Sequence, residues 1–184
     1  MKILLLYSTY DGHTREIANK VAAQLKRVGC AFDLFDFNQL PTIVLADYNA
    51  VLIAAAIRYG HFHESVIQFV KTHRILLNTK LTAFLGVCLV ARKPNRQLPD
   101  HNIYLKKFLR RTKWHPTLCE AVAGALRYPR YTWLDKQLIR CMMWFTGGET
   151  NTNKEVVYTN WQQVERLVDT LVQALKKNSI TSVV

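Results

Sequence analysis

Residues 2–28 read KILLLYSTYDGHTREIANKVAAQLKRV and combine a strand, a polar loop and a helix in that order. Residues 2–7 form an apolar run of strand length. From Thr14 onward apolar residues recur every three or four positions, as in an amphipathic helix. Gly29 is a typical residue at the end of such a helix. A strand that leads through a short loop into a helix is the usual first unit of a parallel α/β sheet.

The rest of the chain repeats this alternation. Residues 50–57 (AVLIAAAI) and 83–90 (AFLGVCLV) are apolar throughout, which is typical of strands buried on both faces. Two more strands are predicted at residues 31–37 and 118–126, and further helices at residues 64–77, 102–111 and 161–176. The pattern predicts an α/β fold with a doubly wound, five-stranded parallel sheet and helices on both faces.

One connection is too long for this pattern. About 34 residues separate Leu126 from the last helix, whereas strand–helix connections usually take about two to six. We therefore predict a single domain over residues 1–184, with a segment inserted at about residues 127–158 after the fifth strand. The front of this insertion, RYPRYTWLDKQLIRCMMWF, begins as a loop at Arg127 and continues as an amphipathic helix over residues 134–145.

The inserted helix has a moderately apolar side. A helical wheel places Leu134, Leu138, Cys141, Met142 and Phe145 on that side, while Lys136, Arg140 and Met143 fall on the polar side. Trp133 and Trp144 suit the depth of a membrane interface. The helix is predicted to dock on a bilayer or to cover the active site. The alternative is an ordinary helix that packs its apolar side on the domain body.

The charge is concentrated in the middle of the chain. The formal net charge is +12, and residues 92–140 carry twelve Lys and Arg against three Asp and Glu, a balance of +9. This balance indicates a surface for anions such as lipid headgroups, phosphate or carboxylate substrates, or nucleic acid. A solvated basic face without a ligand is the alternative.

Several classes of protein receive no support from the sequence. The apolar runs are far shorter than the roughly 20 residues of a membrane-spanning helix, and the first ten residues are predicted as a strand, not a signal peptide. The four cysteines, at positions 30, 88, 119 and 141, lack the spacing of a metal site or a disulfide framework. We predict a cytoplasmic protein with reduced thiols and no bound metal.

The loop after the first strand suits a phosphate group. Ser8, Thr9 and Thr14 provide hydroxyl groups, Gly12 permits close approach of the backbone, and the following helix offers unpaired N–H groups. The loop matches neither a P-loop nor a dinucleotide fingerprint. The alternative is that Asp11 or Thr14 simply caps the helix.

Two later loops are expected at the same edge of the sheet. Residues 57–63 (IRYGHFH) and 91–99 (ARKPNRQLP) follow the two central buried strands, so they would meet the first loop and bracket a flat ring. His61 and His63 are interpreted as polar loop residues, not as metal ligands.

Segments along residues 1–175 resemble a known family. The loops STYDGHT and AAAIRYGHFH, with the five-strand order, resemble the flavodoxin fold, which binds FMN. More narrowly, STYDGHTREIA, AAIRYGHFH, VCLVARKP, AGALRYPRY and GGETNTNKEVVYTNW, in this order, resemble the menaquinone-dependent protoporphyrinogen oxidases of bacterial haem synthesis. A flavodoxin-like domain is therefore expected. An aspartate and a histidine flank Gly12, where flavodoxins often have threonines.

The resemblance implies an FMN site. The residues implied at the phosphate are Ser8, Thr9, Asp11, Gly12, His13 and Thr14. Those implied along the isoalloxazine ring are Ile57, Arg58, Tyr59, Gly60, Leu89, Val90 and Ala91. It also implies oxidation of protoporphyrinogen IX to protoporphyrin IX, with electrons passed through FMN to menaquinone or ubiquinone. The protein would then work on the inner face of the cell membrane, as a peripheral protein.

The remaining predicted residues are expected to contact the substrate or the membrane. Arg58 and three further arginines lie in segments expected near the flavin, where they could pair with the substrate's carboxylates. The further residues predicted for substrate or membrane are Arg92, Arg127, Arg130, Leu134, Leu138 and Phe145. The sequence does not identify the residue that takes the substrate's proton. It shows no catalytic triad or carboxylate pair, as expected where the flavin itself performs the redox step. Association into a homo-oligomer is left open.

Three other functions compete with this interpretation. A flavodoxin-type electron carrier would bind FMN without a substrate, but such carriers are acidic as a family. An FMN-dependent NAD(P)H:quinone reductase is closer, and the sequence separates it poorly. The basic stretch KKFLRRTKWH at residues 106–115 could bind nucleic acid, yet no recognition motif accompanies it, so no nucleic-acid partner is predicted.

Overall fold

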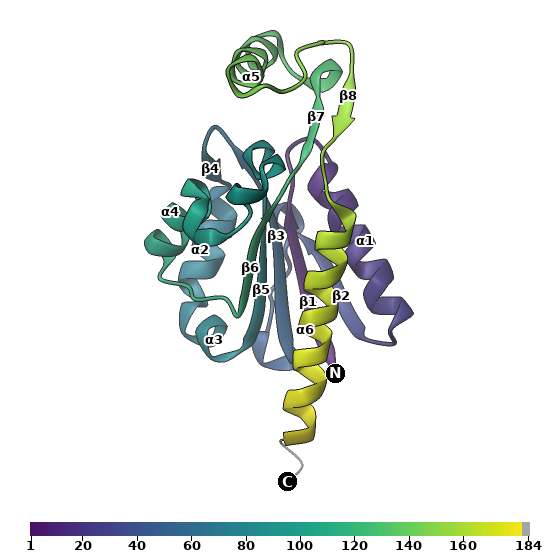
Figure 1. The fold of residues 1–184 in the computed structure, drawn as a ribbon. Coiled ribbons are helices and arrows are strands. Elements are labelled where there is room, and N and C mark those ends of the chain that lie inside the picture. Colours follow the sequence, from purple (N-terminus) through teal and green to yellow (C-terminus); the bar gives the residue numbers. More distant parts are fainter. Residues whose placement is uncertain (182–184) are drawn as a thin grey trace.

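The structure is a computed structural model that describes residues 1–181. A parallel sheet in the order β2-β1-β3-β5-β6 forms its centre (Figure 1). These strands are β1 (Lys2–Ser8), β2 (Ala31–Asp36), β3 (Ala50–Arg58), β5 (Leu81–Val87) and β6 (Leu118–Val122). The short strand β4 (His61–Phe62) turns back and pairs antiparallel with the end of β3. The predicted five-stranded parallel sheet is confirmed.

Helices cover both faces of the sheet (Figure 1). One face carries α1 (His13–Arg27) and α6 (Trp161–Thr181). The other carries α2 (Glu64–Thr72), α3 (Arg74–Thr79) and α4 (Ile103–Thr112). A hydrophobic core lies on each face of the sheet, and alternate residues of β1 pack into one or the other. Leu5 packs with α1 and α6, and Leu6 packs with α2 and α4. The continuous apolar runs of the sequence therefore mark strands that are covered on both sides.

Short 3-10 turns complete the connections. They are η1 (Phe37–Gln39), η2 (Leu45–Asp47), η3 (Leu89–Arg92), η4 (Pro94–Arg96), η5 (Pro99–His101) and η6 (Tyr128–Arg130). Three of these turns, η3 to η5, follow β5 in close succession and lead into α4. The basic residues 92–140 begin within this connection.

Three predicted elements end or break earlier than expected. The strand predicted at residues 83–90 ends at Val87, and Leu89 and Val90 begin η3. The helix predicted at residues 64–77 breaks at His73, so that α3 takes a new direction and buries Leu77 in the core. The strand predicted at residues 118–126 leaves the sheet after Val122 and continues as β7 (Ala125–Arg127). Gly124 packs against Val87 here, with a side-chain carbon of Val87 only 3.3 Å from where a Cβ would stand. Periodicity alone does not reveal such turns of the backbone.

The insertion forms a hairpin that carries a helix. Strand β7 pairs antiparallel with β8 (Glu155–Val157), and α5 (Trp133–Thr146) lies between them in sequence. Figure 1 shows α5 above the end of the sheet at which the parallel strands finish. A small separate core of Leu126, Tyr128, Tyr131 and Met143 joins the hairpin to α5. The predicted helix is present, and it begins one residue earlier than expected.

Helix α5 turns its apolar side outward. Trp133, Leu134, Trp144 and Phe145 are each about 67–74% exposed. The prediction that Met143 belongs to the polar side was wrong, because Met143 is fully buried and attaches the helix to the domain. The alternative that the apolar side packs on the domain body is also wrong.

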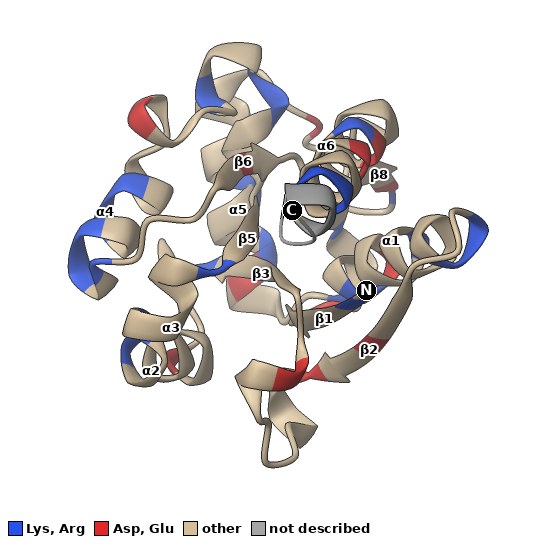
Figure 2. Ribbon diagram, turned by 90° about the horizontal axis from the view of Figure 1, so that it is seen from below, with Lys and Arg blue, Asp and Glu red and all other residues tan. Residues whose placement is uncertain are grey.

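Lys and Arg residues lie along α4, as Figure 2 shows. This helix is part of the basic residues 92–140. Among residues 1–181 no helix combines the length and the apolar character that crossing a membrane requires. All four cysteines are free: Cys30 and Cys88 are buried, Cys119 is half-buried and Cys141 on α5 is exposed.

Candidate functional site

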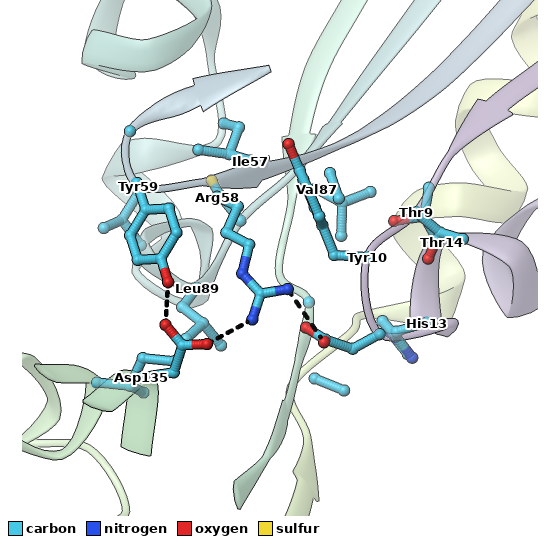
Figure 3. A pocket seen from close by; sticks show the side chains of 18 of the residues that line it. Thr9, Tyr10, His13, Thr14, Ile57, Arg58, Tyr59, Val87, Leu89 and Asp135 are labelled. Atoms are coloured by element: carbon cyan, nitrogen blue, oxygen red, sulfur yellow. Dashed lines mark hydrogen bonds and ion pairs between the residues drawn. The ribbon is translucent and has the colours of Figure 1, made fainter. Parts of the chain in front are cut away.

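A cavity of about 240 Å³ lies at the edge of the sheet where β1, β3, β5 and β6 end. Its walls come from the loop after β1, the turn between β3 and β4, the start of η3, and α5 (Figure 3). Helix α4 adds Tyr104. The cavity therefore lies between the sheet and the inserted helix, and its lining is mostly apolar.

The loop after β1 forms a cradle of hydrogen-bond donors. Gly12 adopts φ +85°, a left-handed conformation that favours glycine, and its N–H donates to Thr9 Oγ1 over 3.0 Å. Among the described residues, no side chain accepts a hydrogen bond from the first turn of α1, so those N–H groups are available to an anion. The alternative in which Asp11 or Thr14 caps the helix was therefore wrong.

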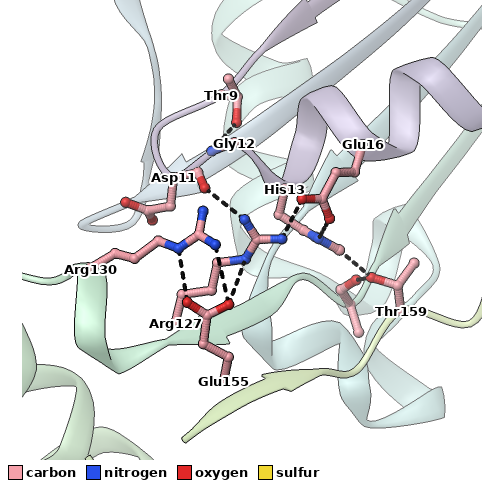
Figure 4. Close-up of polar contacts among 10 residues, drawn as sticks. Thr9, Asp11, Gly12, His13, Glu16, Arg127, Arg130, Glu155 and Thr159 are labelled. Carbon is pink, nitrogen blue, oxygen red and sulfur yellow. Dashed lines mark hydrogen bonds and ion pairs between the residues drawn. The ribbon is translucent and has the colours of Figure 1, made fainter. Parts of the chain in front are cut away.

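His13 fixes the loop to the irregular segment that follows β8 (Figure 4). Its Nε2 lies 2.6 Å from the hydroxyl of Thr159, which itself donates to the carbonyl of Ala123. Its Nδ1 lies 3.0 Å from a carboxylate oxygen of Glu16. Burial lowers the pKa of His13 below its usual value, although Glu16 offsets part of this effect. His13 is therefore mainly an anchor for the cradle.

Arg127 supports the same loop from below (Figure 4). Its guanidinium donates to the carbonyl of Asp11 over 3.2 Å and to Glu16 over 2.5 Å, and its side chain is only 6% exposed. Burial raises the pKa of Glu16, but hydrogen bonds from Arg127 and His13 outweigh this and hold the pKa below its usual value. Arg127 thus places a positive charge beneath the cradle, outside the cavity lining.

Arg58 crosses the cavity wall between two carboxylates (Figure 3). It donates to Asp135 on α5 over 2.9 Å and approaches Asp11 at 3.5 Å. The rings of Tyr10 and Tyr59 flank the guanidinium at 5.2 and 5.7 Å. Arg58 therefore links the phosphate cradle, the β3–β4 turn and the inserted helix.

Asp135 is the buried partner in this cluster. Its side chain is 7% exposed, and it accepts hydrogen bonds from Arg58 and from the hydroxyl of Tyr59. The hydrogen bond from Tyr59 and the charge of Arg58 hold the pKa of Asp135 below its usual value, against the opposing effect of burial. Burial raises the pKa of Asp11, and Arg58 offsets part of that rise. The pKa of Asp135 therefore lies below that of Asp11.

The other predicted arginines have different partners. Arg92 donates to both the carbonyl and the hydroxyl of Thr146 over 2.7 Å, and so holds the last turn of α5. Arg130 is exposed and pairs with Glu155 at 2.9 Å. Of the four predicted arginines, only Arg58 lines the cavity within the described chain.

Most residues predicted for the flavin lie around the cavity. They are Thr9, Asp11, His13, Thr14, Ile57, Arg58, Tyr59, Gly60, Leu89 and Val90. Ser8, Gly12 and Ala91 lie next to the lining without being part of it. From the set predicted for substrate or membrane, Leu138 lines the cavity, whereas Leu134 and Phe145 lie on the exposed side of α5.

Several lining residues were not among the individual site residues predicted from the sequence, although the helix at residues 134–145 was predicted to cover the site or to dock on a bilayer. They are Tyr10, Ala56, Val87, Cys88, Tyr104, Gly124, Ala125, Tyr131, Asp135, Ile139 and Met142. The sheet-edge rule could have found Gly124 and Ala125, because they follow β6 just as the predicted loops follow β3 and β5. Asp135 stands three residues after Thr132, whose hydroxyl caps α5, and this spacing marks a helix start. Nothing in the sequence points to Tyr104.

The arrangement suits a flat aromatic ring that carries a phosphate. The cradle at Gly12 offers backbone N–H groups, the hydroxyls of Thr9 and Thr14, and the nearby charge of Arg127. Beyond it, Leu89, Val90 and aromatic side chains form apolar walls. A phosphorylated flavin fits this set of donors and walls.

The chain has relatives across most of its length. Residues 4–153 match the flavodoxin domain family. The protoporphyrinogen IX dehydrogenase (quinone) of Escherichia coli strain K12 is 48% identical over 164 residues, which cover 89% of this chain and 91% of that protein. The protein of the same name from Leishmania major is 46% identical over 168 residues, covering 90% of this chain and 72% of that protein.

Solved structures agree on the fold. A flavodoxin from the domain Archaea has a TM-score of 0.53 at 14% identity and covers 96% of this chain and 99% of that one. The rubredoxin oxygen:oxidoreductase of Desulfovibrio gigas has a TM-score of 0.57 at 16% identity, covering 96% of this chain and 36% of that one. Together with the sequence matches, these similarities show that the chain belongs to the flavodoxin-domain family, in the group that contains the quinone-dependent protoporphyrinogen IX dehydrogenases.

Proposed function

We propose that this chain oxidises protoporphyrinogen IX to protoporphyrin IX in haem biosynthesis, with FMN as its cofactor and a membrane quinone, menaquinone or ubiquinone, as electron acceptor. The observation that carries the proposal is the cavity between the phosphate cradle and α5, in a chain 48% identical to a dehydrogenase of that name. An electron carrier would need only an exposed flavin edge. The inserted helix instead encloses space beside the predicted ring site.

The cradle residues would hold the FMN phosphate. The N–H groups of the first turn of α1 and the hydroxyls of Thr9 and Thr14 are its donors, while Arg127 contributes charge from beneath. The turn at Tyr59 and Gly60, with Leu89 and Val90, would flank the isoalloxazine. When bound, FMN supplies the redox chemistry, and the chain supplies position, charge and exclusion of water.

The substrate would occupy the space between the ring site and α5. Protoporphyrinogen IX is a bulky, largely apolar tetrapyrrole with two carboxylates, so it needs apolar walls and a cation. Leu138, Ile139 and Met142 of α5 provide apolar surface, and Tyr104 faces them from α4. Arg58 is the cation on the cavity wall. A guanidinium pairs well with a carboxylate because both are planar and can form two parallel hydrogen bonds.

The exposed side of α5 would rest on the membrane. Trp133, Leu134, Trp144 and Phe145 form an apolar surface, which we call the outer face of α5, and Arg140 on the same helix is exposed. Aromatic and basic side chains in this combination favour the interface of an anionic bilayer. Leu138 and Met142 border both this face and the cavity, so a membrane quinone would have a short route to the flavin.

Two measurements on the purified protein test the proposed function. We expect a flavin absorption spectrum, and we expect protoporphyrin fluorescence to appear when protoporphyrinogen IX and a quinone are added without oxygen. Rapid quinone reduction by NADH or NADPH with no turnover of protoporphyrinogen would instead establish the competing reductase. A flavin spectrum with neither activity would indicate an electron carrier.

A further inference from the structure

We infer that Asp135 occupies, in the ligand-free protein, the position on Arg58 that a substrate carboxylate takes, so that substrate binding releases the first turn of α5. Asp135 would thus be a positioning residue that holds the first turn of α5 against Arg58 until a carboxylate replaces it. The inference rests on the proposed function, since it assumes a substrate that carries carboxylates.

The contact joins parts of the chain that are far apart in sequence. Arg58 ends β3, and Asp135 lies 77 residues later in the first turn of α5. Both residues line the cavity, so the ion pair stands where the proposed substrate binds. Tyr59 adds a hydrogen bond to the same carboxylate from the next position in the chain (Figure 3). The side chain that ties α5 to the opposite wall of the cavity is therefore a carboxylate bound by a cation and a hydroxyl.

Charge balance permits an exchange of one carboxylate for another. Arg58 already faces two carboxylates, with Asp135 at 2.9 Å and Asp11 at 3.5 Å. A third anion in the cavity would repel both carboxylates. Asp11 is part of the cradle loop, whereas the backbone of Asp135 belongs to the insertion, so Asp135 is the carboxylate that we expect to move. Removing one partner of a buried ion pair is costly unless another charge takes its place, and a substrate carboxylate would do so.

The two ends of α5 are held by different kinds of contact. At its last turn Arg92 binds Thr146, and the adjacent Met143 is fully buried. At its first turn Asp135 holds the helix to the β3–β4 turn, while Trp133 and Leu134 beside it are exposed. Loss of the Asp135 contact would therefore free the first turn while the last turn stays in place. Helix α5 would pivot about its C-terminal end.

The first test measures turnover in the Asp135→Asn variant, which keeps the side-chain shape and removes the charge. We expect the KM for protoporphyrinogen IX to fall roughly threefold to tenfold, because the substrate no longer competes with an internal carboxylate. Flavin content and the KM for the quinone should not change. An unchanged or higher KM for protoporphyrinogen IX would overturn the inference.

The matched control is Glu149→Gln. Glu149 also belongs to the insertion and pairs with Lys154 at 3.6 Å, outside the cavity lining. We expect this variant to keep the wild-type KM. An equal fall in KM in both variants would show a general loosening of the insertion and would overturn a specific role for Asp135.

The second test measures hydrogen exchange of the backbone amides of residues 136–140 in the flavin-loaded protein. Protoporphyrin IX should speed exchange in the wild type, and its dimethyl ester, which lacks the free carboxylates, should not. In Asp135→Asn the exchange should already be fast without ligand. Equal effects of acid and ester, or wild-type exchange in the variant, would overturn the inference.

The exchange comparison between wild type and Asp135→Asn needs no turnover. If the wild type fails to oxidise protoporphyrinogen IX, the proposed function fails. Slow exchange in Asp135→Asn is a separate result, and it would show that the Asp135 contact does not hold α5. If Asp135→Asn does not fold, Tyr59→Phe removes one hydrogen bond from the same carboxylate. That variant should show a smaller change in exchange in the same direction, and wild-type exchange would again count against the inference.

Discussion

Gly12 is the residue on which the phosphate cradle depends most directly. Its φ of +85° is strained for any side chain, and the cradle's free N–H groups follow it immediately. We expect Gly12→Ala to lower the free energy of unfolding by about 1 kcal/mol or more and to weaken FMN binding. Thermal unfolding and FMN titration of the apoprotein measure the two effects.

Gly29 provides the control for this substitution. It also has a positive φ, of +68°, and no atom of the described chain lies within 4 Å of the position where a Cβ would stand. Gly29→Ala should therefore cost similar stability and leave FMN affinity unchanged. Equal loss of FMN affinity in the two variants would mean that the cradle has no special role.

His13 gives the fold a dependence on pH. Burial lowers its pKa in the folded protein, so its contribution to stability is complete above the unfolded value of about 6.5 and is lost as the pH falls through the folded value. We expect the melting temperature to fall between pH 7.5 and pH 5.5, and to fall less in His13→Gln. Thermal unfolding at the two pH values provides the measurement, and an identical fall in both proteins would contradict the assignment.

Single residues of the site were predictable where they follow a strand. Thr9, Ile57 and Leu89 could be predicted because the ends of parallel strands converge at one edge. Asp135 could not, because its place in the cavity depends on how the insertion folds back over that edge. The roles of arginines were equally hidden, since a guanidinium that binds a ligand and one that binds a helix end look alike in a sequence.

At the scale of elements, Arg92 fixes the position of α5. Its guanidinium holds the carbonyl and hydroxyl of Thr146 in the last turn, where a positive charge also complements the helix dipole. We expect Arg92→Ala to destabilise the fold by roughly 1–3 kcal/mol and to make the segment after α5 more sensitive to protease. Urea unfolding and limited proteolysis report these changes.

The control for Arg92→Ala is a second arginine of the basic residues 92–140. Arg140 is exposed on α5 itself, so Arg140→Ala should change stability by less than about 0.5 kcal/mol. If both variants unfolded at the same urea concentration as the wild type, the hydrogen bonds to Thr146 would contribute little to holding α5.

Whole elements were predicted better than their orientation. Apolar runs identified β3 and β5, and periodicity identified α5 to within one residue at each end. The periodicity of α5 did not reveal which side faces the domain. The buried side includes Asp135 and Met143, and the larger apolar residues point outward. A helical wheel assumes that the most apolar side is buried against the domain, and this assumption fails for α5.

At the scale of the whole molecule, the charge and the outer face of α5 should act together on a membrane. The chain carries a net charge of +12. We expect binding to vesicles that contain anionic lipid and weaker binding as salt rises from about 50 to 500 mM, because salt screens charge. Cosedimentation with vesicles measures the bound fraction.

Substitutions on α5 separate the apolar contribution from the charge. Leu134→Glu with Phe145→Glu should release the protein from anionic vesicles while FMN stays bound, because both side chains are exposed and lie outside the cavity lining. Ile75→Glu with Leu76→Glu, on exposed residues of α3, changes the charge equally and should have a smaller effect. Equal release by the two pairs would exclude a specific role for the outer face of α5.

The placement of the four thiols allows α5 to be labelled selectively with a thiol-reactive reagent. Cys30 and Cys88 are buried, and burial with the nearby Glu120 raises the pKa of Cys119 to about 12, so these thiols resist alkylation at neutral pH. Cys141 is exposed on α5. A maleimide fluorophore should therefore label this helix without any engineered cysteine. Its emission colour would report the passage of α5 from water into lipid in the unmodified sequence.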